Sequence, residues 1–166
     1  MSRFNTWYTI LNGTYNSRNE PVQSLDPVSR WLIATRSVVF VMTANSVILG
    51  TLLSVLAGGF TPSLIPYFLL ILLGLMLAHA TSNLFNDYWD AKHGIDTTVG
   101  YFRPAYLPHP IISGMMSSRG LFSLGLIHLA AVVSIAFYFA LIRGPTVLLF
   151  AGLRSEERRV GKECRL

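Results

Sequence analysis

Three long runs without a charged residue constrain the fold of this chain more than any other feature of its sequence. The runs cover residues 37–60, 63–80 and 121–142, and a fourth apolar run begins at Pro145. Each of the first three is close to the roughly 20 residues that a helix needs to cross a bilayer. Hydrophobic residues make up 52% of the chain and charged residues only 13%, which excludes an ordinary soluble domain. The sequence therefore predicts an all-α, multi-spanning transmembrane helical bundle with three full helices and part of a fourth.

The basic residues that flank these runs predict the orientation in the membrane. They fall before the first run or between the second and the third: Arg3, Arg18, Arg30, Arg36, Lys92, Arg103 and Arg119. The segment between the first two runs, residues 58–66, has no charge. By the positive-inside rule, the N-terminus and the 83–119 segment face the cytoplasm, and the chain is a multi-pass protein of the cytoplasmic membrane. Residues 1–29 are polar and lack the apolar core of a signal peptide, so they are predicted to be a cytoplasmic leader of little order.

The last residues differ in character from the rest of the chain. Apolar sequence stops at Leu153, and the string RSEERRVGKEC that follows matches the in-frame translation of a common DNA sequencing adapter. We therefore expect residues 154–166 to be an adapter-derived artefact, and the residues before them to be the N-terminal fragment of a longer membrane protein. The only cysteine, Cys164, falls in this tail, so no disulfide or cysteine–metal site is predicted. The tail carries five basic and three acidic residues, so the formal charge of +5 falls to +3 without it and indicates no nucleic-acid partner.

Four polar side chains gather where the second apolar run gives out. Asn83, Asn86, Asp87 and Asp90 are spaced i, i+3, i+4 and i+7, so on a helix all four project from one face. Carboxylates at membrane depth are costly and mark functional sites. Two carboxylates with neighbouring amide oxygens suit Mg²⁺, which keeps several waters and completes its shell with substrate phosphate. The pattern predicts a magnesium site with a diphosphate as its natural partner.

Residues next to this stripe favour the same substrate class. Lys92 and Arg103 can meet phosphate oxygens that the metal does not neutralise. Tyr88 and its aromatic neighbours can stabilise a cation through the ring quadrupole. Together these groups indicate ionisation of an allylic diphosphate. Simpler interpretations stay open at this point: Asn and Asp often cap or solvate a helix end, and Lys92 and Arg103 could serve orientation alone.

The histidines in this region carry less weight. His79 lies one turn before Asn83 on the same face, where a histidine more often hydrogen-bonds a neighbouring helix than binds metal. His93 and His109 are expected to lie in a loop and to face solvent.

At these residues the chain resembles the UbiA superfamily of intramembrane prenyltransferases. The string NDYWD at residues 86–90 fits the first aspartate-rich motif of that family, NDxxD. Residues 83–96 are most like its 1,4-dihydroxy-2-naphthoate polyprenyltransferase branch. The string HPIISG at residues 109–114 is similar to a later family element, and residues 31–36 are similar to the start of its first helix. The resemblance covers residues 31–153.

The resemblance implies a helical bundle around a central cavity that opens to lipid. In this family Mg²⁺ held by two aspartate-rich motifs binds the diphosphate of a polyprenyl diphosphate, and the allylic cation left after ionisation alkylates an aromatic acceptor. Carried over by position, the catalytic residues are Asp87 and Asp90, the metal ligands are Asn83, Asp87 and Asp90, and the substrate-binding residues are Asn83, Asn86, Tyr88, Lys92 and Arg103. Residues 30–153 would be the N-terminal part of the prenyltransferase membrane domain. That part lacks the second motif, so the fragment alone is expected to be inactive.

The resemblance favours a 1,4-dihydroxy-2-naphthoate-like acceptor and a role in menaquinone biosynthesis, a membrane quinone pathway. Hydroxybenzoate and non-quinone acceptors stay open, because Pro108-His109 replaces the Asn-Arg of the later family element and Gly94 stands where many relatives have aspartate. A different class of function is a multi-spanning transporter or cation-binding subunit that uses Asp87 and Asp90 for a coupling ion. Such proteins favour broken helices at the membrane midplane, whereas this cluster follows the end of an apolar run. A structural membrane subunit is the third possibility.

Overall fold

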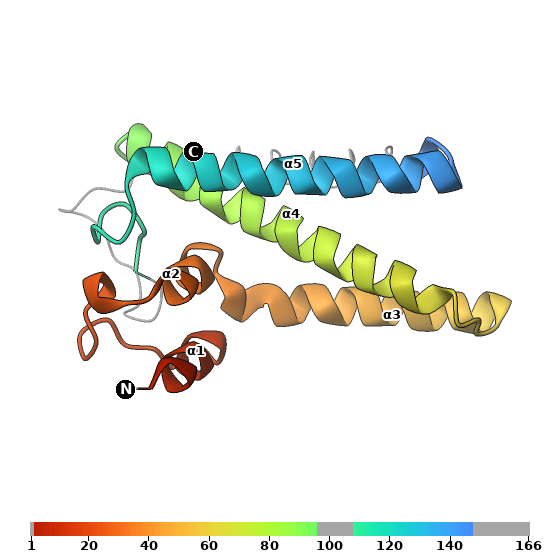
Figure 1. The fold of residues 1–166 in the computed structure, drawn as a ribbon, viewed down its shortest axis with the longest axis horizontal. Helices are drawn as coiled ribbons and strands as arrows, with labels where there is room; N and C mark the ends of the chain where they lie inside the picture. The colour runs from red at the N-terminus through yellow and green to blue at the C-terminus, as the bar shows by residue number, and fades with distance from the viewer. Residues whose placement is uncertain (1, 96–107, 148–166) are drawn as a thin grey trace.

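The computed structural model describes residues 2–95 and 108–147, and over these ranges it contains helices and turns without a strand. Its helices, in chain order, are α1 (Arg3–Leu11), the short 3₁₀ helix η1 (Val22–Ser24), α2 (Pro27–Ala34), a second 3₁₀ helix η2 (Ser37–Val39), α3 (Phe40–Gly58), α4 (Leu64–Lys92) and α5 (Ser118–Arg143). Figure 1 shows α3, α4 and α5 as long rods, with α1 and α2 gathered at one end. The all-α prediction is confirmed. Arg103, the tail and most of the fourth apolar run lie outside the described residues.

Three helical segments are long and apolar enough to cross a membrane, in agreement with the first three apolar runs. They are Ser37–Gly58, Leu64–Lys92 and Ser118–Arg143. Large apolar side chains on them are exposed, among them Leu56 at 83% and Leu141 at 70%. A surface of this kind suits hydrocarbon and not water. The chain is therefore a membrane protein with at least these three candidate spans.

Helix α4 lies between α3 and α5 and packs mainly against α5. Two glycines allow the close approach of these helices. A Cβ atom on Gly74 would lie 3.1 Å from the Ile135 side chain, and one on Gly125 would lie 3.1 Å from the Phe85 ring. The contact continues along both helices, since the rings of Tyr67 and Phe139 lie 6.1 Å apart.

The N-terminal segment is ordered, so the prediction of a leader of little order is wrong. Its residues Ile10, Tyr15, Val22 and Leu25 are buried in the same core cluster as Leu84 of α4. The Tyr15 hydroxyl donates to the Glu20 carbonyl at 2.7 Å, and burial together with the Glu20 charge raises the Tyr15 pKa to about 12. This packing could not be predicted from the sequence, because the buried apolar residues of the segment are few and irregularly spaced in a polar stretch.

Asp26 joins the N-terminal segment to α2. Its carboxylate accepts from the backbone N–H groups of Val28 and Ser29 at 3.1 and 3.2 Å, which caps the helix, and Pro27 occupies the first turn. The same carboxylate accepts from the Trp7 indole of α1 at 3.4 Å. The hydrogen bond from the Ser29 hydroxyl is the main cause that holds the pKa of Asp26 below its usual value.

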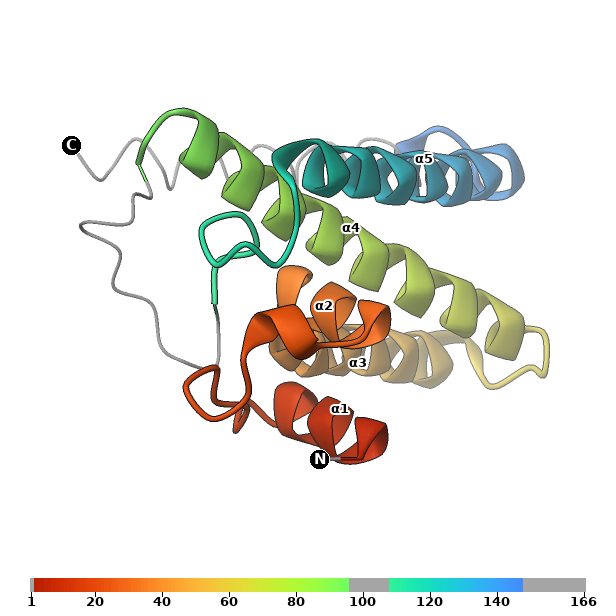
Figure 2. The ribbon, with the colours of Figure 1, turned by 60° about the vertical axis from the view of Figure 1, so that its left-hand side comes forward.

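The segment before α5 closes the same end of the bundle. Figure 2 shows residues 108–117 beside α2 and the C-terminal part of α4. The Gln23 side chain donates to the Ser113 carbonyl at 2.9 Å, across 90 residues of sequence. The N-terminus and residues 83–95 and 108–119 therefore lie at one end of the bundle, as the charge pattern requires, and their cytoplasmic location stays a prediction.

Candidate functional site

The four predicted site residues on α4 share one face of a continuous helix. Because α4 runs unbroken from Leu64 to Lys92, the spacing of Asn83, Asn86, Asp87 and Asp90 brings their side chains into one stripe. Asn83 and Asp87 are buried, with 7% and 1% of their surface exposed, whereas Asn86 and Asp90 are half-buried. The stripe therefore runs from the protein interior towards the more exposed C-terminal end of α4.

Arg36 forms an ion pair with Asp87. Its Nη2 atom lies 2.5 Å from Oδ1 of Asp87, and 28% of the arginine side chain is exposed. Arg36 lies in the corner between α2 and η2, with φ 56° and ψ 50°. It is the one non-glycine residue with positive φ among those described, and a left-handed backbone at such a residue marks a constrained position. From the sequence, Arg36 was interpreted as an orientation determinant and as part of the 31–36 element, and its contact with Asp87 was not predicted.

Asn83 holds the residue before Arg36 in place. Its Nδ2 atom donates to the Thr35 carbonyl at 2.9 Å, in a buried position. Thr35 follows the last residue of α2, so its carbonyl would otherwise be an unsatisfied group at a helix end. With the amide nitrogen committed in this way, the Oδ1 atom of Asn83 is the one that can act as a ligand. Asn83 and Asp87, one turn apart on α4, thus hold two consecutive residues of the corner between α2 and η2.

Polar atoms with no hydrogen-bond partner lie in this same corner. Among the residues that the structure describes, Nε of Arg36 and Oγ of Ser37 are buried without a partner. A buried donor without a hydrogen-bond partner costs stability and commonly marks a position where a ligand or ion binds. The corner therefore has donors available for an anion next to the carboxylates of the stripe.

The stripe fits a hard cation in part. The described residues include no group of three or more His, Cys, Asp or Glu side chains that could hold a metal. Asp87 and Asp90 nevertheless place two carboxylates one turn apart, with amide oxygens beside them. Mg²⁺ commonly takes one or two carboxylates and fills its shell with water and phosphate oxygens, so this donor set fits a magnesium–diphosphate site.

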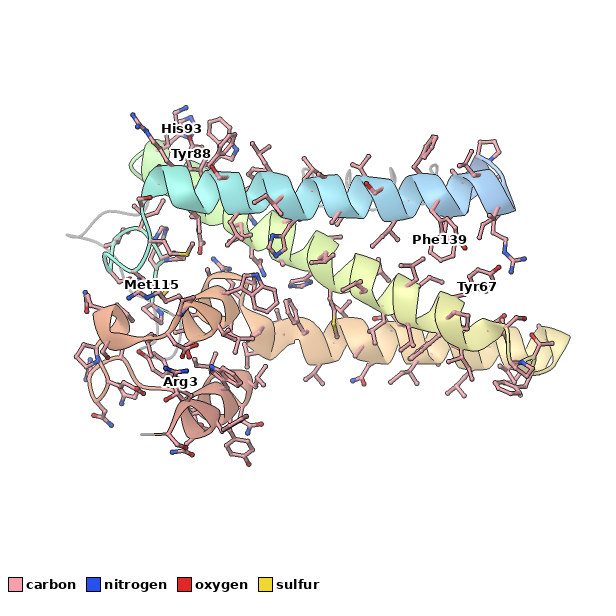
Figure 3. All side chains as sticks on the ribbon, in the orientation of Figure 1. Arg3, Tyr67, Tyr88, His93, Met115 and Phe139 are labelled. Atoms are coloured by element: carbon pink, nitrogen blue, oxygen red, sulfur yellow. The ribbon has the colours of Figure 1, made fainter. Side chains whose placement is uncertain are left out.

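Tyr88 and Lys92 lie on the opposite side of α4 from the stripe. The Tyr88 ring packs against Phe122 of α5 with a centroid distance of 4.8 Å. The Lys92 Nζ atom lies 4.8 Å from the ring centroid of Trp89 and 5.7 Å from that of Tyr88. Figure 3 places the labelled Tyr88 and His93 next to the start of α5, away from α2. The structure therefore does not bring Tyr88 and Lys92, both predicted to bind substrate, together with Asn83 and Asp87.

Deeper along the stripe, polar and aromatic side chains link all four neighbouring helices. Nδ1 of His79 lies 3.5 Å from the Thr43 hydroxyl of α3, which agrees with the expectation that His79 hydrogen-bonds a neighbouring helix. The Trp31 indole donates to Nε2 of His128 at 2.9 Å, and Nδ1 of His128 bonds the Leu124 carbonyl. With the indole N–H as donor, Nε2 of His128 accepts and its Nδ1 faces the Leu124 carbonyl at 2.8 Å. Nothing in the sequence pattern predicted this contact between α2 and α5.

His109 is buried, so the expectation that it faces solvent is wrong. It is 1% exposed, and its Nδ1 atom accepts from the backbone N–H of Ile111 at 3.1 Å. The Ser113 hydroxyl donates to the His109 carbonyl at 2.6 Å. The HPIISG element therefore forms a compact turn organised around the imidazole. His93, in contrast, is exposed at the end of α4, as expected.

A comparison with known families agrees with the helical membrane fold. The sequence model described as the UbiA prenyltransferase family matches residues 39–153. No curated protein and no solved structure matches the chain. The matched region includes α3, α4 and α5 and every described residue of the α4 stripe. The chain belongs to the UbiA prenyltransferase family.

Proposed function

We propose that this segment forms the first half of the active site of a Mg²⁺-dependent prenyltransferase. The complete enzyme would transfer a polyprenyl group from polyprenyl diphosphate to an aromatic acceptor in the bilayer. The acceptor we favour is a 1,4-dihydroxy-2-naphthoate-like ring, which would place the reaction in menaquinone biosynthesis. Family membership supports membrane prenyl transfer in general. The acceptor and the pathway rest on the resemblance of residues 83–96 to one branch of the family.

The observation that carries the proposal is the convergence of Asn83 and Asp87 on the corner that holds Arg36. In our assignment Asn83 Oδ1, Asp87 and Asp90 hold the metal, and Asn86 contacts the diphosphate. When bound, Mg²⁺ would neutralise charge on the diphosphate and so favour its departure. The protein contributes a stripe of oxygen ligands on one continuous helix. Two of the four side chains are buried, which fixes their positions.

Arg36 is the residue that we add to the predicted site. It supplies a positive charge beside Asp87, and its buried Nε donor is available for an anionic oxygen. A guanidinium can hold a carboxylate and a phosphate oxygen at once, because its donors are arranged in a planar fork. We propose that Arg36 keeps Asp87 in place before the substrate binds and contacts the diphosphate afterwards. Lys92 and Arg103 remain proposed diphosphate contacts from outside the stripe.

For the cationic intermediate we propose the aromatic residues that border the stripe. The Trp31 and Phe40 rings lie 6.3 Å apart, and Phe40 lies 6.2 Å from His79, one turn below Asn83. Aromatic faces in this position can stabilise an allylic cation after diphosphate leaves. Tyr88 was predicted for this role from the sequence, but its ring contacts Phe122 and Lys92 on the other side of α4.

The activity is proposed for the complete bundle and not for this segment alone. The family resemblance implies a second aspartate-rich motif, which residues 30–153 do not contain. A prenyl cation formed in an incomplete bundle would not be shielded from water. We therefore expect no prenylated product from the segment itself.

The experiment is a prenyl-transfer assay on membranes that contain the product of the uninterrupted gene, with Mg²⁺, polyprenyl diphosphate and dihydroxynaphthoate. Asp90→Asn should abolish turnover, because it removes a ligand charge and keeps the shape of the side chain. Glu20→Gln is the matched control, since it makes the same carboxylate-to-amide change at a residue that contacts Thr6, away from the stripe. Equal activity of Asp90→Asn and the control would contradict the proposal.

A further inference from the structure

Helix α1 has a buried face and an exposed apolar face that is bordered by polar residues. Its buried side chains, Thr6 and Ile10, face the core. On a helix of 3.6 residues per turn, Phe4, Tyr8 and Leu11 share a second face, and they are 78%, 67% and 46% exposed. Exposed polar residues, Asn5 of α1 and Asn12 at its C-terminal cap, border this apolar face on one side. One face of α1 is thus satisfied by the protein, and the other presents a large apolar surface that the described residues do not cover.

The position of α1 brings this apolar face close to the lipid-facing surface of the bundle. A Cβ atom on Gly13, two residues after the end of α1, would lie 3.1 Å from Val38 of η2, which leads into α3. Val41 and Met42, in the first turn of α3, are 61% and 71% exposed. Figure 1 shows α1 at the end of the bundle where α3 begins, instead of alongside the middle of the spanning helices. The apolar surface of α3 therefore continues onto a short helix at the level of the membrane boundary.

The charges around α1 also suit a lipid surface. Arg3 and Arg18 are exposed, and the first acidic residue of the chain is Glu20. Phosphate-bearing lipid headgroups attract basic residues, and the headgroup level of a bilayer is where aromatic side chains such as Tyr are enriched. An amphipathic helix with an aromatic face and nearby arginines is typical of a segment that lies in the membrane interface.

We propose that α1 is an interfacial helix and that the lipid bilayer itself covers its apolar face. Phe4, Tyr8 and Leu11 enter the boundary between headgroups and acyl chains, while Asn5 and Asn12 stay in water. Because Asp26 ties Trp7 of α1 to the start of α2, the helix fixes the depth at which the corner around Arg36 meets the membrane surface. This inference depends on the chain being a membrane protein and does not depend on the proposed reaction.

The test uses the whole chain in vesicles of phosphatidylcholine and phosphatidylglycerol, with Cys164→Ser as background. Single nitroxide labels are attached to Tyr8→Cys, Phe4→Cys, Asn5→Cys and Leu53→Cys variants. For each label, electron paramagnetic resonance compares collisions with oxygen, which concentrates in lipid, and with a water-soluble nickel complex. The Leu53→Cys label reports insertion of α3, because Leu53 is 59% exposed on that helix. Asn5→Cys is the control on α1, since position 5 lies about 100° around the helix from position 4.

We expect the oxygen-to-nickel accessibility ratio to be severalfold higher at positions 4 and 8 than at position 5, and highest at position 53. Equal ratios at positions 4 and 5, with position 53 in lipid, would overturn the proposal. Low accessibility to both reagents at positions 4 and 8 would also overturn it, because it would mean that protein covers the face. If one label disturbs α1, the other still decides, because positions 4 and 8 lie one turn apart on the same face.

Discussion

Arg36 and Asp87 lie 51 residues apart in the sequence and form an ion pair at the end of the bundle. The pair joins the corner after α2 to the first aspartate of the NDYWD motif. Asp87 is 1% exposed, so its negative charge would be costly without a partner. Arg36 accepts a left-handed backbone conformation at this corner, and Asn83 fixes the residue before it. The carboxylate that the sequence singled out is therefore held by an arginine that the sequence did not.

Removing the arginine should destabilise the protein more than removing an exposed one. Arg36→Ala leaves the Asp87 carboxylate buried and unpaired, and the loss of one partner of a buried pair typically costs 3–5 kcal/mol. We expect about 3 kcal/mol here, because the arginine is partly exposed. The measurement is the midpoint of unfolding by dodecyl sulfate in detergent micelles, followed by helix content.

The matched control for this substitution is Arg119→Ala, which removes the same charge from an exposed residue at the start of α5. It should change stability by less than about 0.5 kcal/mol. A second comparison, Arg36→Gly, loses the ion pair but relieves the left-handed backbone, which costs about 1–2 kcal/mol in other residues. Arg36→Gly should therefore be more stable than Arg36→Ala. Equal stability of the Arg36→Ala and Arg119→Ala proteins would show that the ion pair contributes nothing.

Asn83→Asp should destabilise the protein, although a carboxylate is a good ligand for a hard cation. The substitution replaces the Nδ2 donor by a carboxylate oxygen, which would face the Thr35 carbonyl at the present 2.9 Å separation. A buried acceptor left without its donor costs about 1–3 kcal/mol. We expect this loss in the same unfolding measurement. Asn86→Asp, on the half-buried part of the stripe, is the control and should cost clearly less.

Acid should loosen the contact between α1 and α2 only at low pH. Because hydrogen bonds from Ser29 lower the pKa of Asp26, the stabilising contribution of the carboxylate is fully present above the unfolded pKa of about 3.9 and is lost as the pH falls through the lower folded pKa. Trp7 donates to this carboxylate, so its fluorescence should report the change. The difference between the wild type and Asp26→Ala, about 1 kcal/mol for the lost helix cap at neutral pH, should shrink below that pH. A constant difference down to pH 2 would contradict the assignment.

The spanning helices and the α4 stripe were predictable because both depend on local patterns. Uncharged runs of bilayer length gave the three spans, and the i, i+3, i+4, i+7 spacing placed Asn83 and Asp90 on one face. The same periodicity could have placed Tyr88 on the opposite face, since five residues after Asn83 correspond to well over one turn. That signal was present in the sequence and was not used.

The contacts that complete the site could not be predicted in this way. The Arg36–Asp87 and Asn83–Thr35 contacts join residues about 50 positions apart, and only tertiary packing decides such pairs. The order of the N-terminal segment depends on a few buried residues, such as Ile10 and Val22, that a polar composition conceals. His109 is buried for a similar reason, because its ring accepts from the turn that follows it.

Binding of a divalent cation in the presence of inorganic diphosphate tests the central claim most directly. Mn²⁺ replaces Mg²⁺ because its electron paramagnetic resonance signal falls on binding, and the chain is assayed in vesicles with and without diphosphate. We predict Mn²⁺ binding that requires diphosphate, that is lost in Asp87→Asn and Asp90→Asn, and that persists in Glu20→Gln. Binding that is equally strong without diphosphate would favour a cation-binding subunit or transporter. Diphosphate-dependent binding that survives in both aspartate variants, or no binding at all, would contradict a metal–diphosphate site on α4.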